Sequence, residues 1–276
     1  MSLRAAVPVP LRGVLAADTM SQPAPPSALE TRELTIRFGG HVAVSSVSCA
    51  FQPGTLTAIV GPNGAGKTTY FNLISGQLKA TSGRVLLHGE DVTDLPTPLR
   101  TTRGMGRAFQ LTNLFPDLSV MENVRLAVQA RAGMGLNLTS IWSNHRELIG
   151  KAEHFLSRVA MADRRDVRTS ALPHGDQRKL EVAILMALEP DIFMFDEPTA
   201  GMSVDEVPVI LELIHGIKMQ KDKTILLVEH KMDVVRALAD RIIVLHQGEL
   251  VADGEPKAVI ASSIVQEAYL GVAAAA

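Results

Sequence analysis

The sequence predicts an α/β fold: a largely parallel sheet covered on both faces, preceded by an antiparallel β region and carrying an inserted helical subdomain. Three observations lead to this prediction. The apolar, β-branched run 55–60 enters a glycine-rich loop that a helical stretch follows. After residue 190, strand-like apolar runs alternate with helical stretches, which is typical of parallel sheets with crossover helices. Residues from about 112 to 189 are mostly helical in pattern, with an interruption at 133–135.

Composition limits the classes of protein to which the chain can belong. Its 276 residues, 46% of them hydrophobic, suit one large domain or two small ones. The net charge of -2 provides no basic field that would indicate nucleic acid or anionic lipid as a partner. Cys49 is the only cysteine, which excludes a disulfide within the chain and indicates a reducing cytosol. The longest apolar run, 182–188, is far shorter than the ~20 residues of a spanning helix, so a role at a membrane requires another chain to cross it.

The two ends of the chain are expected to be tails around a single domain at 29–271. Residues 1–28 are rich in proline, alanine and serine and lack periodicity, which predicts disorder. Two prolines and an arginine interrupt the apolar region that a signal peptide would require. Met20 is an alternative start to Met1, and the intact mass of the native protein distinguishes them. Residues 272–276 are the C-terminal tail.

The first elements of the domain are strands. Alternating residues on both sides of Gly39-Gly40, at 34–38 and 42–51, predict a hairpin. A further strand and turn are expected at 84–89. The later part of the domain is expected to contain strands at 192–195, 224–228, 241–245 and 249–252, with helices at 207–220 and 232–239.

The loop between the strand 55–60 and a helix that Gly76 could close carries the clearest chemical signal. Glycines let backbone N–H groups turn towards a phosphate, and the N-terminus of the helix adds partial positive charge. Lys67 is predicted to reach the outer phosphates, and the Thr68 hydroxyl to bind Mg²⁺. The alternative is a glycine-rich turn with an exposed lysine. The loop fits the pattern G-x-x-x-x-G-K-[ST] and consists of Gly61, Pro62, Asn63, Gly64, Ala65, Gly66, Lys67, Thr68 and Thr69.

Two carboxylates, Asp196 and Glu197, directly follow the predicted strand 192–195. Their position predicts that they lie at the carboxyl edge of the sheet, beside the phosphate loop. Asp196 is expected to hold Mg²⁺, directly or through water, and Glu197 to orient or deprotonate an attacking water. The alternative is a strand that simply ends in solvent.

Three further polar segments follow strands or open a helix. Gln110 could donate to the nucleophilic water or bind Mg²⁺, although a glutamine by itself is most often a surface residue. His230 follows another apolar strand and either donates a hydrogen bond to the γ-phosphate or is structural. The segment 174–177 follows Pro173 and opens a helix, where Gly175 permits the close approach of a ligand.

In their order along the chain, these motifs resemble those of an ATP-binding-cassette (ABC) nucleotide-binding domain over about residues 29–271. The resemblance implies a P-loop ATPase fold with ATP and Mg²⁺ as ligands. It implies that Phe38 stacks on adenine, and that Gln110 senses Mg²⁺ and contacts the membrane partner. The signature, which caps the ATP bound on the opposite subunit, would be His174, Gly175, Asp176 and Gln177.

The same resemblance assigns the catalytic roles and the assembly. Asp196 would be the magnesium-associated acid, Glu197 the catalytic acid and His230 the switch histidine. Each ATP would lie between the phosphate loop of one subunit and the signature of a second, identical or similar, subunit. ATP would draw the subunits together, hydrolysis would release them, and the helical subdomain at about 112–189 would pass the movement to permease subunits.

Several segments are similar to one subgroup, the ATPase subunits of bacterial importers for branched-chain amino acids and of related amide and urea importers. This similarity implies integral-membrane permease partners, an extracytoplasmic solute-binding protein that acts indirectly, and a peripheral location on the cytoplasmic face of the inner membrane. No nucleic acid partner is expected. The segments that carry the similarity are Arg37–Gly40, Phe109–Gln110, Asp196–Met202, Glu229–Asp233 and Ala268–Gly271.

Two places depart from the family pattern. Pro173 and His174 stand where the family commonly has serine and glycine, so the hydroxyl that normally reaches the γ-phosphate is missing. Asp176 in the same turn adds a negative charge that would oppose an anion. Ser203 stands where the next loop usually has an aspartate, with Asp205 two positions later. The expected result is a working but weakened clamp on the ATP of the second subunit.

Three other functions stay open at this point. A soluble ABC-type ATPase that acts on the ribosome or on nucleic acid is expected to carry two cassettes or a basic stripe, and this chain has neither. A small-molecule P-loop kinase would leave Glu197, the signature and His230 without a role. A degenerate cassette that binds ATP without hydrolysing it is disfavoured by Glu197 and His230, although Pro173 keeps it open.

Overall fold

The computed structural model describes residues 27–108, 114–134, 145–262 and 265. The predictions for Gln110, for Ala268–Gly271 and for nearly all of both tails concern residues outside this part of the chain. Ala28, which closes the predicted N-terminal tail, is buried, and its amide donates to the carbonyl of Phe51 at 3.0 Å.

Within the described residues, the first sheet is antiparallel and has the strand order β2-β1-β4-β5. Its long strands β1 (Leu29–Phe38) and β2 (His41–Phe51) form the predicted hairpin. Gly39 closes this hairpin with φ 58°, a conformation that favours glycine. The strands β4 (Ser82–Leu87) and β5 (Glu90–Asp91) extend the sheet around the predicted second turn.

The second sheet has the order β10-β9-β3-β8-β7-β6, and its neighbouring strands are parallel except for β9 with β10. Every residue of β3, β7 and β8 is buried, which explains the continuous apolar runs in the sequence. The strands of this sheet are β3 (Leu56–Val60), β6 (Met105–Ala108), β7 (Ile192–Asp196), β8 (Thr224–Val228), β9 (Arg241–His246) and β10 (Glu249–Gly254).

The edge strand β6 is one of two strands, with the two-residue β5, that the sequence does not predict. It is four residues long, and Gly106 breaks any apolar pattern. A Cβ at this position would lie 2.5 Å from Cδ1 of Leu185 and 2.7 Å from Cγ of Pro190. Gly106 therefore lets a short strand pack closely against its neighbours, at the expense of the sequence signal.

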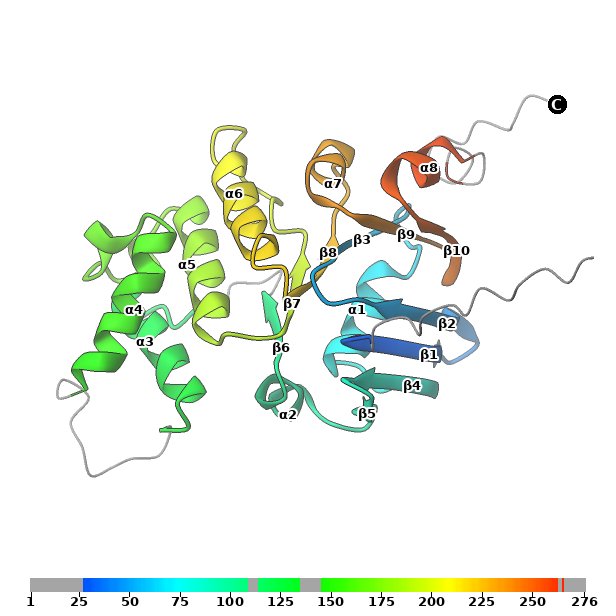
Figure 1. Cartoon of the computed structure of the whole chain (residues 1–276), viewed down its shortest axis with the longest axis horizontal. Coiled ribbons are helices and arrows are strands. Elements are labelled where there is room, and N and C mark those ends of the chain that lie inside the picture. Colours follow the sequence, from blue (N-terminus) through cyan, green and yellow to red (C-terminus); the bar gives the residue numbers. More distant parts are fainter. Residues whose placement is uncertain (1–26, 109–113, 135–144, 263–264, 266–276) are drawn as a thin grey trace, which may run out of the picture.

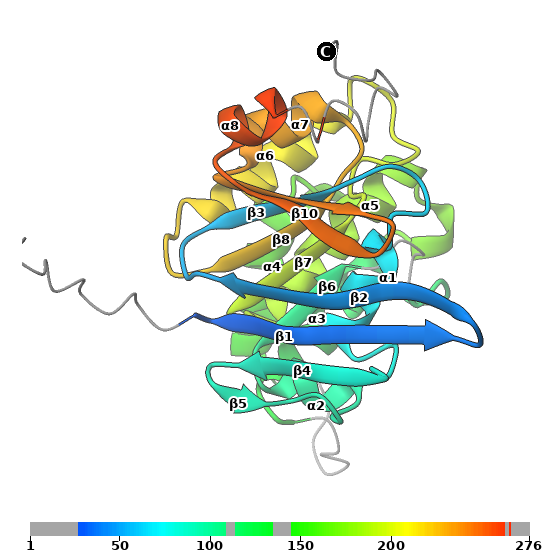
Figure 2. The same ribbon diagram turned by 90° about the vertical axis from the view of Figure 1, so that its right-hand side faces the viewer.

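The parallel sheet is covered differently on its two faces (Figures 1 and 2). On one face, α1 (Lys67–Ser75) lies between the two sheets and joins an apolar cluster to which both contribute. The prediction of a sheet covered on both faces is confirmed, with the antiparallel sheet forming part of one cover. The opposite face carries α6 (Val207–Lys218), α7 (Met232–Leu238) and α8 (Pro256–Ala261).

A group of helices lies beside the edge strand β6 (Figure 1). The helices α3 (Val120–Arg131), α4 (Arg146–Arg158) and α5 (His174–Ala187) share one apolar cluster, which continues into β7 through Phe193 and Phe195. We call α3, α4 and α5 the helical layer; whether it is an inserted subdomain stays a prediction. No helix in the described part of the chain is long and apolar enough to cross a bilayer.

The helix α2 (Thr97–Thr102) places a buried arginine under the phosphate-loop helix. Arg100 is 2% exposed and donates to the carbonyls of Leu73 at 2.8 Å and Ile74 at 2.6 Å. These carbonyls lie at the C-terminus of α1, where the helix dipole favours a cation. Gly76, the predicted end of this helix, has φ 80° and packs against the guanidinium. Burial lowers the pKa of Arg100 to about 10.

Candidate active site

The phosphate loop wraps around the side chain of Lys67. The ammonium Nζ donates to the carbonyl oxygens of Gly61 at 2.8 Å and Pro62 at 3.0 Å. Gly66 has φ 96° and turns the chain into α1, a conformation that side chains disfavour. Gly61 must lack a side chain, because a Cβ there would lie 2.2 Å from the carbonyl oxygen of Leu245. The loop is therefore preorganised around a cation.

Two neighbouring segments hold this loop in place. The amide of Gly248, in the turn between β9 and β10, donates to the carbonyl of Ala65 at 3.0 Å, and the carbonyl of Gly248 accepts from Ser45 at 2.8 Å. A Cβ on Gly66 would lie 2.5 Å from the carbonyl oxygen of Ala43. The strand β2 and the β9–β10 turn thus brace the loop, in addition to the strand and helix that flank it in sequence.

Several other predicted ligand residues of this region are at least partly exposed, whereas Ala65 is buried. Asn63, Gly64 and Thr68 are exposed, and Thr69 is half-buried. Thr68 lies in the first turn of α1, beside the loop. Phe38, at the end of β1, is 50% exposed, so its ring is accessible to a planar ligand.

The carboxylate of Asp196 ends β7 and is buried, with 3% of the residue exposed. Its Oδ2 accepts a hydrogen bond from Nη2 of Arg107 at 2.8 Å, while its Oδ1 is buried without a hydrogen-bond partner among the described residues. Burial raises the pKa of Asp196, and Arg107 opposes this shift. Burial lowers the pKa of Lys67, which the charges of Glu197 and Asp196 oppose. The cation of the loop and both acids therefore act on one another at the same edge of the sheet.

The residues at this edge fit a magnesium ion. Mg²⁺ takes oxygen ligands and is usually held by one or two carboxylates together with substrate phosphates. Asp196 offers a buried oxygen that has no hydrogen-bond partner in the described part of the chain, and the hydroxyl of Thr68 lies in the first turn of the adjoining helix. Gln110, the third predicted ligand, lies outside the described residues; the strand that leads to it ends at Ala108, which pairs with Phe195 directly before Asp196.

Glu197 and His230 lie in contact at this edge. Nε2 of His230 is 2.7 Å from Oε1 of Glu197. Glu197 has φ 49°, a conformation that is rare for a residue with a side chain, and its amide donates to the carbonyl of Val228 at 2.9 Å. The end of β8 thus fixes the backbone that presents the predicted catalytic acid.

Glu229 shapes the turn that presents His230, and the sequence analysis assigned it no role. It is 2% exposed, and its carboxylate accepts from the amides of His230 at 2.8 Å and Lys231 at 3.2 Å. It also accepts from the hydroxyl of Thr199, in the loop after Glu197. An acid placed between an apolar strand and a histidine is the sequence signal that could have indicated that Glu229 shapes this turn.

The predicted signature opens α5, in the helical layer. Pro173 and His174 are exposed at the start of this helix. Gly175 lies against the carboxylate of Glu206, where a Cβ would lie 2.0 Å from Oε1. Gly175 therefore has a close neighbour within the same chain, although this neighbour is the flexible end of a side chain and could move for a larger residue.

The expectation that Asp176 opposes an anion at this helix end needs correction. Its carboxylate pairs with Arg164 and, at 3.0 Å, with Lys179, so two cations compensate its charge. The side-chain amide of Gln177 donates to the carbonyl of Leu172 at 2.9 Å. Both side chains are thus engaged within this chain, and His174 is the exposed residue of the segment 174–177.

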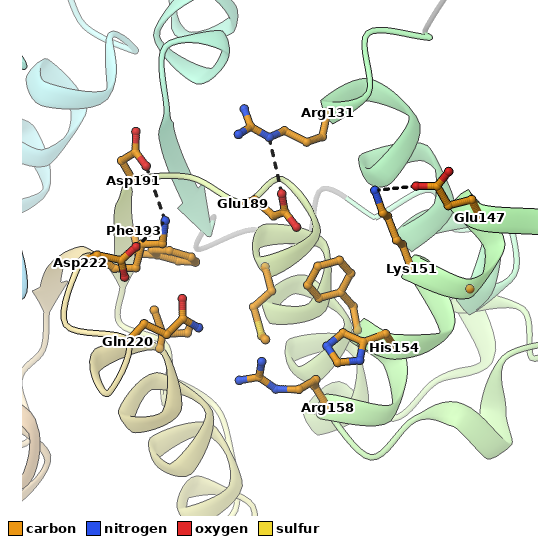
Figure 3. Close-up of a pocket in the computed structure, with 15 residues that line it drawn as sticks. Arg131, Glu147, Lys151, His154, Arg158, Glu189, Asp191, Phe193, Gln220 and Asp222 are labelled. Atoms are coloured by element: carbon orange, nitrogen blue, oxygen red, sulfur yellow. Dashed lines mark ion pairs between the residues drawn. The ribbon is translucent and has the colours of Figure 1, made fainter.

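A separate cavity of about 690 Å³ lies between the helical layer and the sheet (Figure 3). His154 of α4 lines one side, and Asp191 and Lys223, which directly precede β7 and β8, line the other. Charged side chains pair within its lining, Lys223 with Asp191 at 3.5 Å and Arg131 with Glu189 at 3.9 Å. Since Asp191 and Asp196 lie at opposite ends of β7, this cavity is at the edge of the sheet away from the predicted catalytic residues.

The phosphate loop on a parallel sheet, the acids at its carboxyl edge and the attached helical layer define an ATP-binding cassette. Comparison with known proteins gives the same class. The ABC transporter family model matches residues 44–200. The high-affinity branched-chain amino acid transport ATP-binding protein LivG of Escherichia coli (strain K12) is 38% identical over 259 residues, which cover 92% of this chain and 100% of LivG.

Solved structures agree with this class. MJ1267, an ATP-binding cassette of an ABC transporter in its ADP conformation, aligns with a TM-score of 0.76 and 27% identity over 89% of this chain and 99% of that one. The dimeric post-hydrolysis structure of the cassette MJ0796, bound to ADP and Pi, aligns with a TM-score of 0.71 and 25% identity over 83% of this chain and 98% of that one.

The chain belongs to the ATP-binding proteins of ABC transporters, and it is an ATPase whose hydrolysis of ATP is coupled to transport. The predicted fold and family are confirmed, and the small-molecule kinase alternative is wrong. The roles of the individual site residues stay predictions.

Proposed function

We propose that this chain is the ATP-hydrolysing subunit of an importer for branched-chain amino acids or related small polar solutes. The observation that carries the catalytic part is the meeting of Lys67, Asp196, Glu197 and His230 at one edge of the parallel sheet. The solute rests on the similarity to LivG, since the site described above suits a nucleotide rather than a transported solute.

The phosphate loop would hold the triphosphate of ATP. Lys67 would exchange two neutral acceptors, the carbonyls of Gly61 and Pro62, for anionic phosphate oxygens, with which its hydrogen bonds are stronger. The N-terminus of α1 would add the partial charge of the helix. Mg²⁺ bound by Thr68 and Asp196, with Gln110, would neutralise negative charge on the phosphates.

Glu197 would act as the base for the attacking water. A base must lie within hydrogen-bond reach of the proton that it takes and must be held in the correct orientation. The contact of Glu197 with His230 and the fixed backbone at Val228 supply that orientation. His230 would in turn donate to the γ-phosphate, so loss of this phosphate would be sensed beside the base.

The signature would complete the site of a second ATPase subunit, identical or homologous to this one. Two observations support this arrangement. Pro173 and His174 leave the N-terminal end of α5 exposed, and the related cassette MJ0796 is dimeric with ADP and Pi. Hydrolysis would remove the γ-phosphate that joins the two subunits and would let them separate.

The partners would be integral-membrane permease subunits, which the helical layer and the Gln110 segment would contact. A solute-binding protein outside the membrane would act through the permease. This chain would lie peripherally on the cytoplasmic face of the membrane. The support is its membership of a transporter family, because transport requires a path through the bilayer that another subunit must supply.

Affinity purification from native membranes, with mass spectrometry of the bound proteins, tests this proposal. We expect permease subunits and a second ATPase subunit, and we expect washing at high pH to strip the chain from membranes that retain the permease. In liposomes, the complex should hydrolyse ATP faster when its solute-binding protein carries leucine than when it is empty. Ribosomal proteins in place of permease subunits would instead favour a soluble ABC-type ATPase.

A further inference from the structure

The buried partner of Asp196 is a residue that no sequence motif marked. Arg107 lies on β6, and its side chain is 6% exposed, while that of Asp196 is 1% exposed. The two form an ion pair at 2.8 Å. Burial lowers the pKa of Arg107, and Asp196 opposes that shift. Each of these buried charges is therefore compensated by the other, and removal of either one would leave the other uncompensated in the protein interior.

Further contacts of Arg107 come from the phosphate-loop helix and the turn after it. Its Nη1 donates to Oδ1 of Asn72 at 2.7 Å, to Oγ of Ser75 at 2.8 Å and to Oε1 of Gln77 at 3.0 Å. Its guanidinium carbon lies 4.8 Å from the ring centre of Phe71. These acceptors are neutral, so they orient the guanidinium without cancelling its charge.

The contacts give Arg107 a fixed geometry between three elements. One end of the guanidinium is held by α1, and the other end holds Oδ2 of Asp196 at the tip of β7. The second oxygen of Asp196 is left without a partner among the described residues. A carboxylate with one oxygen held and one oxygen unpaired has a defined direction in which to offer a ligand.

We propose that Arg107 is a positioning residue, the counter-ion of Asp196, which orients this carboxylate and keeps its affinity for free magnesium low. The positive charge of Arg107 repels a divalent ion at Asp196, so the ion is retained only when phosphates add their own negative charge. The proposal rests on the proposed role of Asp196 at magnesium. Its consequence is that the site is loaded with nucleotide and ion together.

Thermal unfolding of the full chain, without nucleotide, gives a readout that is independent of activity. In EDTA, Arg107→Gln should lower the midpoint by roughly 10 °C, because it leaves a buried carboxylate unpaired. Millimolar MgCl₂ should restore part of this loss, whereas NaCl of equal ionic strength should not. The wild type and Arg107→Lys, which keep a positive charge, should not respond to magnesium. Arg103→Gln, an exposed arginine of the same segment, is the matched control.

A double variant separates this role from simple packing. Asp196→Asn combined with Arg107→Gln removes both charges, so it should unfold at a higher temperature than Arg107→Gln alone and should not respond to magnesium. This variant also keeps the test available if Arg107→Gln alone does not fold. The proposal would be overturned if Arg107→Gln lowered the unfolding midpoint equally with aspartate and with asparagine at position 196. It would also be overturned by a folded Arg107→Gln that magnesium does not stabilise.

Calorimetry of ATP binding gives the second measurement. With EDTA, Arg107→Lys should bind ATP as the wild type does. In a separate titration with magnesium, Arg107→Gln should need about tenfold less magnesium than the wild type for half-maximal enhancement of ATP binding. This is the size of the effect that one charge has on a nearby divalent ion even with water-like screening. A magnesium requirement that is unchanged or raised in Arg107→Gln would overturn the proposal. If Asp196→Asn alone leaves the magnesium effect on ATP binding intact, the proposed role of Asp196 fails instead.

Discussion

The phosphate-loop edge and the signature end of α5 differ in how completely this chain determines them. Around the loop, Lys67 and Gly66 are held by β2, by the β9–β10 turn and by the chain's own carbonyls. At the signature, Pro173 and His174 are exposed, although Gly175 is enclosed by Glu206. One chain thus carries a preorganised loop and the predicted catalytic edge, whereas the helix end that we propose for the second nucleotide is an open surface.

The two regions also differ in charge. At the loop edge, buried cations and acids act on one another, and one oxygen of Asp196 has no hydrogen-bond partner among the residues that the structure describes. At the signature, Asp176 is already compensated by Arg164 and Lys179. Among the described residues, the loop edge thus offers a ligand a carboxylate oxygen that has no hydrogen-bond partner, whereas at the signature His174 is exposed and Asp176 is already paired. Substitutions at the loop edge should therefore have larger effects, and those at the signature should appear only in an assembled complex.

Glu197→Gln should give the largest effect. The amide keeps the shape of the side chain but cannot accept the proton of the attacking water, so turnover in the assembled complex should fall by roughly 10²–10⁴-fold. ATP binding, measured by calorimetry, should stay within about threefold of wild type, since the phosphate loop is intact. The exposed Glu212→Gln is the control. Turnover at the wild-type rate would show that another group is the base.

Lys67→Ala should weaken ATP binding by about 10–100-fold, the loss of a charge-assisted hydrogen bond of roughly 1.5–3 kcal/mol. The variant also removes the ammonium that draws the carbonyls of Gly61 and Pro62 together. Calorimetry of the isolated chain is the measurement, because this half of the site does not need a partner. Lys79→Ala, an exposed lysine after α1, is the control. An unchanged affinity for ATP would contradict the assignment of the phosphate loop.

Pro173→Ser should strengthen the contact between the signature and the ATP of the second subunit. The new hydroxyl would add one hydrogen bond of roughly 1.5 kcal/mol to the γ-phosphate on the second subunit, or about tenfold in the ATP concentration for half-maximal hydrolysis. The loss of proline costs a few tenths of a kcal/mol of local order, about a quarter of that gain. Because Asp176 is compensated, its charge should not cancel the effect.

The measurement for Pro173→Ser is the ATP dependence of hydrolysis by the assembled complex. Pro256→Ser, at the start of α8, makes the same exchange away from the site and should leave this dependence unchanged. No shift, or a shift to higher ATP, would mean that His174 already supplies the contact.

The sequence predicted the parts of this molecule that local chemistry determines. The loop from Gly61 to Thr69 and the acids after β7 follow from short patterns whose physical requirements are local. Arg107 and Arg100 could not be found in this way, because each acts across a long sequence separation. Glu229 left a local signal, an acid between an apolar strand and a histidine, but the turn that it shapes is visible only in the structure.

Element boundaries show the same division. Fully buried strands such as β3 and β8 carry apolar runs, so their positions are predictable. The strand β6 has no such run, since Gly106 serves the packing of Leu185 and Pro190 rather than the strand itself. Likewise, the charge of Asp176 was read correctly, but its partner Arg164 lies in a different element, so its compensation was not foreseeable.

Phe38 should give the smallest effect and decides whether the preorganised region extends to the base of the nucleotide. Stacking of one aromatic ring contributes roughly 0.5–1.5 kcal/mol, so Phe38→Ala should weaken ATP binding by about two- to tenfold. Phe38→Tyr keeps the ring and should bind as the wild type does. Inorganic triphosphate has no base, so its affinity should be the same in all three proteins, and Phe115→Ala, another exposed phenylalanine, should change neither ligand. If Phe38→Ala weakens triphosphate as strongly as ATP, the ring supports the loop through the β1–β2 hairpin instead of stacking. In that case the region that this chain preorganises ends at the phosphates, and adenine must be held by other groups.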